Sequence, residues 1–322
     1  MMDWTDRHCR YFHRLLTRRT RLYTEMVTTG ALRHGDVPRH LDFDPAEHPL
    51  ALQLGGSEPE ELAHGAQLAE RWGYDEINLN CGCPSERVQR GAFGACLMAE
   101  PRLVADCVAA MRSAVRLPVT VKHRIGIDRQ ERYDFVRDFV GTVAEGGCEV
   151  FIVHARNAWL KGLSPKENRE LPPLRPAVVA RLKADFPHLT FVSNGGIASD
   201  RAIADRLEEV AGVMIGRHAY HHPWAMTRWD ERFLGGGPST LDRDSVEGAM
   251  VDYMERVAAT GEPWTHVSRH MLGLRHGEPG ARRWRQVWSD PRLKGLGPRE
   301  VSRQARAAAA TSATREPAEL EA

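Results

Sequence analysis

The feature that most constrains the fold of this chain is a regular alternation of short apolar runs with longer helical segments. Most of the short runs are continuously apolar, which is typical of parallel strands buried on both faces. The alternation predicts βαβ units that share one parallel sheet. The expected strands are Thr20–Glu25, Leu50–Leu54, Glu76–Asn80, Val119–Arg124, Val150–His154, Thr190–Asn194 and Gly212–Ile215. The expected helices between them include Glu60–Arg71, Glu100–Val115, Tyr133–Gly146 and Ala177–Asp185.

The alternation continues to about Gly237, close to the roughly 250 residues of a typical (β/α)8 barrel. Only the seven strands named above are found, and a first strand would have to precede Met1. We therefore expect an α/β fold, a TIM (β/α)8 barrel that lacks its first strand. The run Gly235–Pro238 breaks the pattern as a linker would. The predicted domains are a barrel at residues 1–237, a small all-helical domain at 238–306 and a disordered tail at 307–322.

Several classes of protein are excluded or disfavoured by the sequence. No apolar run approaches the roughly 18 residues that a membrane span needs, so an integral membrane protein is excluded. The N-terminal segment MMDWTDRHCRYF has no apolar signal-peptide core, so we expect a cytoplasmic protein. Six cysteines in 322 residues do not make a disulfide scaffold, and reduced thiols are expected in that compartment.

Polar residues gather where the predicted strands end. A (β/α)8 barrel carries its active site at the C-terminal ends of its strands. A single histidine at such an end is more often a local hydrogen-bonding residue than a catalyst. So many polar residues on one rim are hard to explain by core packing. They are Gln53, Asn78, Asn80, Lys122, Arg124, His154, Arg156, Asn194 and Arg217.

Two glycine-containing turns follow the last two predicted strands. Ser193–Ile197 reads SNGGI, and Ile215–Arg217 reads IGR. With a missing first strand, these are the loops after strands seven and eight, the usual phosphate site of this fold. Arg217 would add a charge-assisted contact. Two ordinary glycine turns are an equally good explanation of either motif alone. No G-x-G-x-x-G element is present, so a Rossmann site is not supported.

The segment NLNCGCPS at residues 78–85 is the densest candidate for chemistry. Cys83 follows a buried strand on a Gly-Cys-Pro turn that would present its thiol at the barrel mouth. A thiol with a pKa near 8.5 is mostly protonated at neutral pH and can act as a general acid. A zinc site at Cys81 and Cys83 is weakly supported, because no second Cys or His pair has suitable spacing. We expect no metal, and buried structural thiols at Cys81, Cys96 and Cys107.

Long ordered motifs resemble those of the tRNA-dihydrouridine synthases. They are INLNCGCPSERVQRGAFGACLM, VTVKHRIGID, FIVHARNAWLKGLSPKENRELPPL, SNGGI and GVMIGRHAYHHPW. The likeness runs from Met1 to about Leu296, and ARNAWLKGLSPKENRE is similar to the A-type bacterial subfamily. It implies reduction of uridine 20 or 20a in the tRNA D-loop. NADPH would reduce FMN, hydride would pass from flavin N5 to uracil C6, and Cys83 would protonate C5.

The resemblance also implies roles for particular residues. Asn80 would lie beside the flavin and the target base, and Lys166 and Arg169 would contact tRNA. Arg282 and Arg285 would make further tRNA contacts. No membrane partner is expected, and we expect a monomer. The implied FMN-binding residues are Met1, Met2, Gln53, Lys122, His154, Asn194, Gly195, Gly196, Gly216 and Arg217.

The region from Arg269 to Arg306 is strongly basic, which independently favours an RNA partner. Apolar spacing predicts helices at Val246–Ala258 and Thr265–Leu274. Trp284 and Trp288 could pack in the core or stack on bases. The basic residues are Arg269, Arg275, Arg282, Arg283, Arg285, Arg292, Lys294, Arg299, Arg303 and Arg306, opposed by Glu278, Asp290 and Glu300.

One departure from the family concerns the start of the chain. Family members carry a strand ending in Ala-Pro-Met before the Asp-Trp-Thr-Asp segment, whereas this chain starts at Met1–Met2. We expect the native start to lie upstream. Two other functions stay open: a flavin enzyme that reduces a free pyrimidine or small enone, and a tRNA-binding protein that no longer holds flavin. The basic helical region counts against the first of these.

Overall fold

The computed structural model describes residues 1–313, apart from the side chains of Arg87, Ser312 and Ala313. The chain divides into two compact units. The first comprises residues 1–3 and 21–216, and the second comprises residues 4–20 and the chain from Arg217 onward. These units describe packing alone. The division into functional domains at 1–237 and 238–306 stays a proposal.

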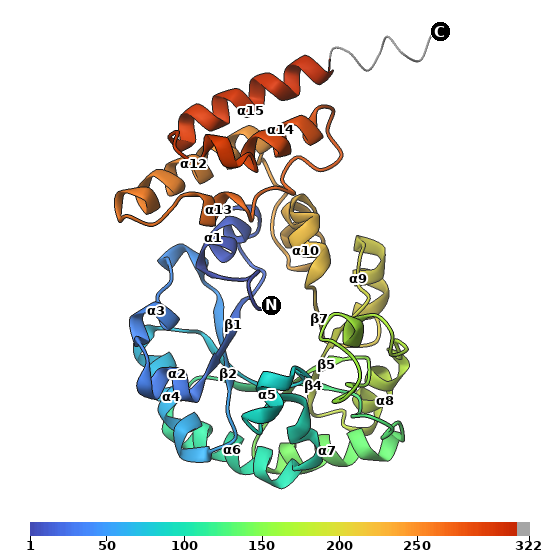
Figure 1. Ribbon diagram of the computed structural model, residues 1–322. Helices are drawn as coiled ribbons and strands as arrows, with labels where there is room; N and C mark the ends of the chain where they lie inside the picture. Colours follow the sequence, from blue (N-terminus) through green and yellow to red (C-terminus); the bar gives the residue numbers. More distant parts are fainter. Residues whose placement is uncertain (314–322) are drawn as a thin grey trace. The chain divides into compact units, whose positions relative to one another are not determined.

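The first unit is built on one seven-stranded sheet in which each strand pairs in parallel with the next along the chain. Figure 1 shows the sheet as a curved wall of arrows. In the part of the chain that the structure describes, β1 and β7 have one partner strand each. The predicted seven-stranded α/β barrel architecture is confirmed. The strands are β1 (Leu22–Thr28), β2 (Leu50–Gly55), β3 (Glu76–Cys81), β4 (Val119–Arg124), β5 (Val150–His154), β6 (Thr190–Asn194) and β7 (Gly212–Met214).

Helices cover the outer face of this sheet (Figure 1). The long ones are α4 (Pro59–Trp72), α6 (Pro101–Ala114), α7 (Tyr133–Glu145), α8 (Ala177–Asp185) and α9 (Asp200–Leu207). The helix α4 shows why the sequence predicts them well. Proline stands at its first turn, where no N–H is needed, and Gly73 ends it in the left-handed region at φ 85°. The shorter helices are α2 (Thr29–His34), α3 (Val37–Leu41), η1 (Pro45–Glu47), α5 (Glu86–Arg90), η2 (Gly94–Ala99) and η3 (Glu167–Arg169).

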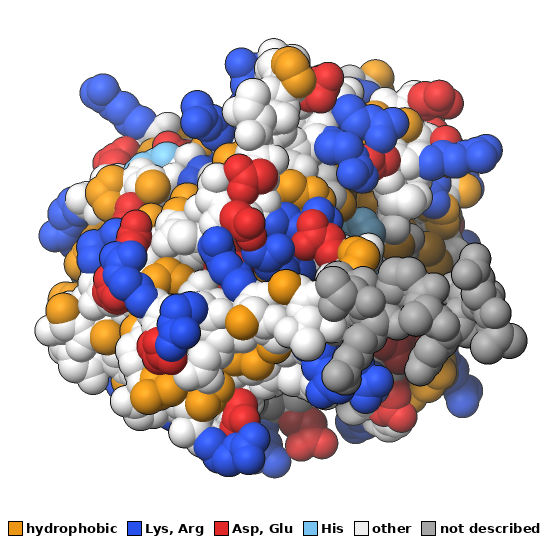
Figure 2. All heavy atoms as spheres, turned by 90° about the horizontal axis from the view of Figure 1, so that it is seen from above, with side chains coloured by type: hydrophobic (Ala, Val, Ile, Leu, Met, Phe, Trp, Pro, Cys, Tyr) orange, Lys and Arg blue, Asp and Glu red, His pale blue; other side chains and the backbone are white. Residues whose placement is uncertain are grey.

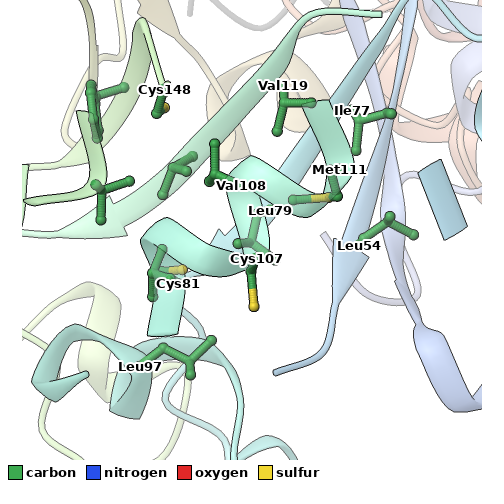
Figure 3. Packing of buried hydrophobic residues seen from close by; sticks show 14 of the residues in the cluster. Leu54, Ile77, Leu79, Cys81, Leu97, Cys107, Val108, Met111, Val119 and Cys148 are labelled. Atoms are coloured by element: carbon green, nitrogen blue, oxygen red, sulfur yellow. The ribbon is translucent and has the colours of Figure 1, made fainter. Parts of the chain in front are cut away.

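The apolar core of the first unit lies between the sheet and its helices. In β3, Ile77, Leu79 and Cys81 face the helix layer, where α6 supplies Cys107, Val108 and Met111 (Figure 3). The alternate residues of a strand point to the opposite face. In β3 these are Glu76, Asn78 and Asn80, so the concave side of the sheet receives polar groups, and these are the groups that form the candidate site.

The second unit is helical and includes the N-terminal helix α1 (Arg7–Leu16). Asp6 caps α1 by accepting the backbone N–H groups of His8 and Cys9. Its carboxylate also contacts Arg269 at 2.6 Å and His270 at 3.0 Å, and these partners lower the pKa of Asp6 well below its usual range, against the effect of its burial. The other elements are α10 (Arg217–His221), η4 (Pro223–Arg228), α11 (Trp229–Phe233), α12 (Arg243–Ala259), α13 (Thr265–Ser268), α14 (Ala281–Trp288), η5 (Pro291–Leu293) and α15 (Pro298–Ala313).

Several predicted segments differ from the structure in their bounds, and three of the differences are the following. The first strand spans Leu22–Thr28 rather than Thr20–Glu25, because its pairing with β2 continues from Leu22 to Thr28. The predicted helix Thr265–Leu274 is helical only at Thr265–Ser268. Residues 307–313, expected in the tail, continue α15, since a run of alanines favours helix. The rest of the predicted tail lies outside the described residues.

Within residues 1–313, no helix has both the length and the apolar character required to cross a bilayer.

Candidate active site

The strand register brings the predicted polar residues to one end of the sheet. Gln53 pairs with Asn78, and Asn78 pairs with Thr120. Two residues further along, Asn80 pairs with Lys122. Because parallel strands of one sheet end on the same edge, polar residues that are scattered over the sequence meet here.

A directional chain of hydrogen bonds runs across three strands below this edge. The amide of Asn80 donates to Gln53 Oε1 at 2.8 Å, and the amide of Gln53 donates to Asn78 Oδ1 at 2.8 Å. The amide of Asn78 donates to Thr120 Oγ1 at 2.8 Å, and the Thr120 hydroxyl donates to Glu76 Oε1 at 2.8 Å. Each donation polarises the next group, so the chain fixes the orientation of all three amides. In this orientation Asn80 Oδ1 is free to accept from the loop beyond β3.

Glu76 anchors the far end of this chain. Its carboxylate is 2% exposed, accepts the Tyr23 hydroxyl at 2.9 Å and forms an ion pair with Arg21. Burial and the neighbouring Glu76 raise the pKa of Tyr23 well above its ordinary value. The predicted site did not include Glu76 or Thr120. An acidic residue at the start of the predicted strand, two positions before Asn78, was the signal that could have found Glu76.

The loop that follows β3 carries Cys83 and is held by Asn80. Asn80 Oδ1 accepts the backbone N–H groups of Gly82 and Cys83, each at 3.0 Å. The Cys83 carbonyl accepts from Ala95 at 2.9 Å, and the thiol lies 3.6 Å from the Ser85 hydroxyl. The Cys83 side chain is half-buried, so its thiol is accessible on a loop whose backbone is fixed on both sides.

Lys122 is a partly buried cation at the same edge. Its ammonium reaches past β5 to donate to Asn194 Oδ1 at 3.2 Å. Burial, together with the nearby Arg124, lowers its pKa to about 8. Among residues 1–313, no carboxylate lies within ion-pair distance of this ammonium. A desolvated cation without a counter-anion fits a ligand that brings negative charge or electron-rich oxygens.

Glycines form a close-fitting cradle beyond β6 and β7. Gly195 and Gly196 have φ values of 112° and 71°, which other residues rarely adopt. A Cβ at Gly195 would lie 2.8 Å from the His154 ring, and one at Gly196 would lie 2.4 Å from Leu174. A Cβ at Gly216 would lie 3.2 Å from the Met1 sulfur. The turn after β6 therefore requires glycine at positions 195 and 196, both for its backbone conformation and for the space that a Cβ would need.

The donor set on this edge fits FMN. Lys122, Gln53, Asn194 and His154 offer a cation, amides and an imidazole, and the glycines of the cradle offer uncovered backbone. Of the remaining predicted FMN contacts, Met1 lies beside Gly216, Met2 is 54% exposed, and Arg217 begins α10 in the second unit. The structure therefore brings together the predicted set within the first unit, and individual contacts to FMN stay predictions.

The other cysteines of the motif region have different surroundings from those of Cys83. Cys81 and Cys107 are buried between the sheet and α6, and burial raises the pKa of Cys81 well above its ordinary value and that of Cys107 to about 12 (Figure 3). Cys96 is half-buried rather than buried and donates to the Phe93 carbonyl at 3.1 Å. In the described part of the chain, no group of three or more His, Cys, Asp or Glu side chains is arranged to hold a metal ion.

The predicted tRNA-contact residues of the first unit lie on the long loop after β5. Lys166 and Arg169 are exposed and flank Asn168, which is fully buried. The Asn168 side chain accepts the Trp159 N–H at 2.7 Å and donates to the Trp159 carbonyl at 2.9 Å. It thereby fixes the shape of this loop, a role that the sequence did not reveal.

The basic region of the second unit has more acidic partners than the three that the sequence between Arg269 and Arg306 supplies. Arg299 pairs with Asp252 and Glu255, and Arg303 pairs with Glu300. Arg275, Arg292 and Arg306 are also paired with acidic groups. Figure 2 accordingly shows Lys and Arg side chains interspersed with Asp and Glu on the face that it presents. The acids of α12, outside the basic segment, supply much of this neutralisation.

Three arginines on α14 differ from the rest. Arg282, Arg283 and Arg285 are exposed, and none of them forms an ion pair within residues 1–313. Arg282 and Arg283 also line a hollow of about 430 Å³ at the start of this helix. Trp284 and Trp288, on the opposite side of the helix, are buried and donate to the Glu247 carboxylate at 3.1 and 3.4 Å. Of the two roles left open for these tryptophans, the structure supports core packing.

Comparison with known proteins gives one consistent answer. The profile of the dihydrouridine synthase (Dus) family matches residues 1–310. The tRNA-dihydrouridine(20/20a) synthase of Salmonella typhimurium is 57% identical over 291 residues, which cover 90% of this chain and 87% of the relative. The enzyme of the same name from Vibrio cholerae is 55% identical over 306 residues, with coverage of 95% and 93%. The one from Escherichia coli strain K12 is 57% identical over 291 residues, with coverage of 90% and 84%. This chain belongs to the dihydrouridine synthase family.

Proposed function

We propose that this chain is a tRNA-dihydrouridine synthase that reduces the C5–C6 double bond of uridine 20 or 20a in the tRNA D-loop. The reaction adds a hydride at C6 and a proton at C5, and NADPH is the reductant that is oxidised. FMN, when bound, supplies the hydride. The names of the relatives support the substrate and its position, and the site supports the chemistry.

The observation that carries this proposal is the placement of Cys83. Its loop is fixed by Asn80 at the edge of the sheet where Lys122 and the glycine cradle also lie. A half-buried thiol on a fixed backbone can hold a proton at a defined position next to a bound base. Cys83 would act as the general acid that delivers the proton to C5.

Other residues of the first unit would hold the cofactor. Lys122, Gln53 and His154 would contact FMN at its ring, and the Lys122 ammonium would stabilise negative charge that develops there. Asn194, Gly195, Gly196 and Gly216 would hold its phosphate, with Arg217 and the N-terminal Met1 and Met2 as further contacts. Asn80 would lie beside the target base. The positive-φ glycines support this assignment, since their N–H groups can approach an anion closely.

Each unit would contribute a surface to tRNA binding. Lys166 and Arg169 would contact tRNA from the loop after β5, and Arg282 and Arg285 would do so from α14. Within residues 1–313, Arg282 and Arg285 form no ion pair, and this supports their use, because a paired arginine must give up its partner to bind a phosphate. The target uridine must also leave its stack to reach Cys83. We expect a monomeric cytoplasmic enzyme.

The test follows the two halves of the reaction separately. Purified holoenzyme is reduced with NADPH without oxygen, and flavin reoxidation is followed after adding tRNA that lacks dihydrouridine. We expect fast reoxidation by tRNA and none above background by free uridine. Cys83→Ala should retain flavin and its reduction by NADPH but slow reoxidation by tRNA by a factor of about 100 or more. Cys96→Ala is the matched control, since that thiol only donates to a backbone carbonyl.

Each outcome separates the competing functions. Comparable reoxidation by free uridine would favour an enzyme for small substrates. Purified protein that binds tRNA but carries no flavin would favour a binding protein. A normal dihydrouridine yield in Cys83→Ala would remove Cys83 as the proton donor.

A further inference from the structure

Cys83 is flanked by two backbone carbonyls that are held by side chains from elsewhere in the first unit. The Gly82 carbonyl accepts from Arg124 Nε at 3.1 Å. The Pro84 carbonyl accepts from Gln89 Nε2 at 2.7 Å. Together with the two N–H groups held by Asn80, these bonds restrain the chain immediately before and after the thiol.

The same two side chains also hold the loop of residues 155–176, which follows β5. Gln89 Nε2 donates a second hydrogen bond to the Leu160 carbonyl at 2.7 Å. One terminal nitrogen of Arg124 donates to the carbonyls of Asn157 and Asn168, at 3.2 and 3.0 Å. Gln89 and Arg124 therefore join the Cys83 loop to the 155–176 loop. Arg124 does so through the residue before the cysteine, and Gln89 through the residue after it.

The 155–176 loop is itself held by side-chain hydrogen bonds. Asn168 crosslinks it internally, and Asp128 Oδ1 accepts the Leu160 N–H at 2.8 Å from the end of the neighbouring loop. Lys166 and Arg169 lie on either side of Asn168 in this loop. A displacement of Lys166 or Arg169 would therefore also displace Leu160 and Asn168. Gln89 donates to the carbonyl of Leu160, and Arg124 donates to the carbonyl of Asn168.

We propose that Gln89 is a positioning residue that couples the 155–176 loop to Cys83, so that engagement of tRNA by this loop fixes the proton donor. The inference rests on the proposed role of Cys83. Gln89 makes no contact with the reacting atoms in this scheme and acts through the Pro84 carbonyl. A misplacement of about 1 Å at a reacting group can cost a factor of about 100 in rate, so two hydrogen bonds that set this position are sufficient to matter.

Gln89 is a better probe of this coupling than Arg124. Arg124 is 3% exposed, and burial lowers its pKa to about 10, so its removal would leave three carbonyls without a donor inside the protein. Gln89 is half-buried on the short helix α5, and methionine matches its length while removing both donors. Gln67→Met, at an exposed position of α4, is the matched control.

The experiment measures both half-reactions of the holoenzyme in wild-type and Cys83→Ala backgrounds. With Gln89→Met in the wild-type background, we expect flavin reoxidation by tRNA to slow tenfold or more at saturating tRNA, with reduction by NADPH unchanged within about twofold. In the Cys83→Ala background, the same substitution should change reoxidation less than about twofold, because Gln89 acts through Cys83. An equal factor in both backgrounds, or no slowing in the wild type, would overturn the proposal.

A second readout keeps the inference testable if Cys83 proves not to be the proton donor. Alkylation of the holoenzyme by iodoacetamide, followed by peptide mass spectrometry, reports the accessibility of Cys83 relative to Cys96. Gln89→Met should raise the Cys83 rate at least threefold over the Cys96 rate, and Gln67→Met should leave the ratio unchanged. If Cys83→Ala alone reoxidises normally, the role of Cys83 fails. In that case, an unchanged alkylation ratio in Gln89→Met would also overturn the coupling.

Discussion

The side-chain oxygen of Asn80 accepts the backbone N–H of Cys83 at 3.0 Å, and its amide donates to Gln53 at 2.8 Å. One residue thus joins the loop of the candidate proton donor to the polar chain below the sheet edge. This series of hydrogen bonds ends at the buried carboxylate of Glu76, which is an acceptor. Each preceding group in the series therefore donates toward Glu76. The position of Cys83 is therefore set by interactions that begin near the start of β3.

Asn80→Ala should impair the tRNA step more than the fold. The substitution frees the N–H groups of Gly82 and Cys83, and we expect single-turnover reoxidation by tRNA to slow by a factor of about 10–100. Asn80→Asp is the control that keeps the acceptor oxygens, so it should retain more of the rate than Asn80→Ala. Equal rates in the two variants would show that the acceptor role is unimportant.

FMN affinity should depend on the protonation of Lys122. Its pKa is lowered to about 8 in the protein without ligand. FMN binding favours the charged form of Lys122. The affinity for FMN should therefore be greatest below pH 8 and fall as the pH rises from about 7 to 9.5. Lys122→Met should bind FMN more weakly, with a flat profile over this range. Titration of flavin fluorescence measures both, and parallel profiles in the two proteins would contradict the assignment.

Loss of Arg282 and Arg285 together should weaken tRNA binding and reduce its dependence on salt. Each phosphate contact that is lost lowers the slope of log K against log salt by about 0.7–0.9. The double variant Arg299→Ala with Arg303→Ala removes the same charge from arginines that are already paired, and it should change the slope less. Filter binding at four salt concentrations provides the comparison. Identical slopes for the two double variants would argue against α14 as a tRNA surface.

Glu247 should be a major source of stability in the second unit. Its buried carboxylate accepts from Trp284, Trp288 and Ser302 and pairs with Arg275. Removing one partner of a buried charged network costs about 3–5 kcal/mol, so Glu247→Ala should lower the free energy of unfolding by this order. Glu255→Ala, on the same helix with an exposed ion pair to Arg299, should cost about 1 kcal/mol or less. Urea denaturation measures both, and similar losses would refute the role of Glu247.

How accurately the sequence predicts the bounds of a strand depends on the pattern of apolar and polar residues in that strand. The strands β4, β5 and β6 begin and end where the sequence predicts, because each has a short apolar run that is followed by polar residues at its C-terminal end. The strand β1 was predicted about two residues too early at its start and ended too soon. Its sequence, LYTEMVT, is neither a continuous apolar run nor a regular alternation, so its extent is decided by its pairing with β2.

The sequence predicts most residues of the candidate site but not the hydrogen bonds that join them. Residue type and position at strand ends identified Cys83, Lys122, Asn80 and Asn194, since barrel geometry brings such ends together. Glu76, Thr120 and Gln89 were missed because each makes a hydrogen bond to a residue far away in the sequence, which for Gln89 is Leu160. Likewise, the sequence between Arg269 and Arg306 predicted a basic region opposed by Glu278, Asp290 and Glu300, whereas in the structure acids of α12 also pair with Arg299 and Arg306.

The sequence alone determined the order of the strands, the polar character of their C-terminal ends and the cysteine that follows β3. These properties follow from local composition and from periodicity, which a chain carries before it folds. Only the tertiary structure decided which polar groups donate to which, which arginines pair with the acids of α12 and how the Cys83 loop is joined to the 155–176 loop. Hydrogen bonds and ion pairs depend on distances of a few ångströms between residues that are distant in the sequence, and only folding sets those distances.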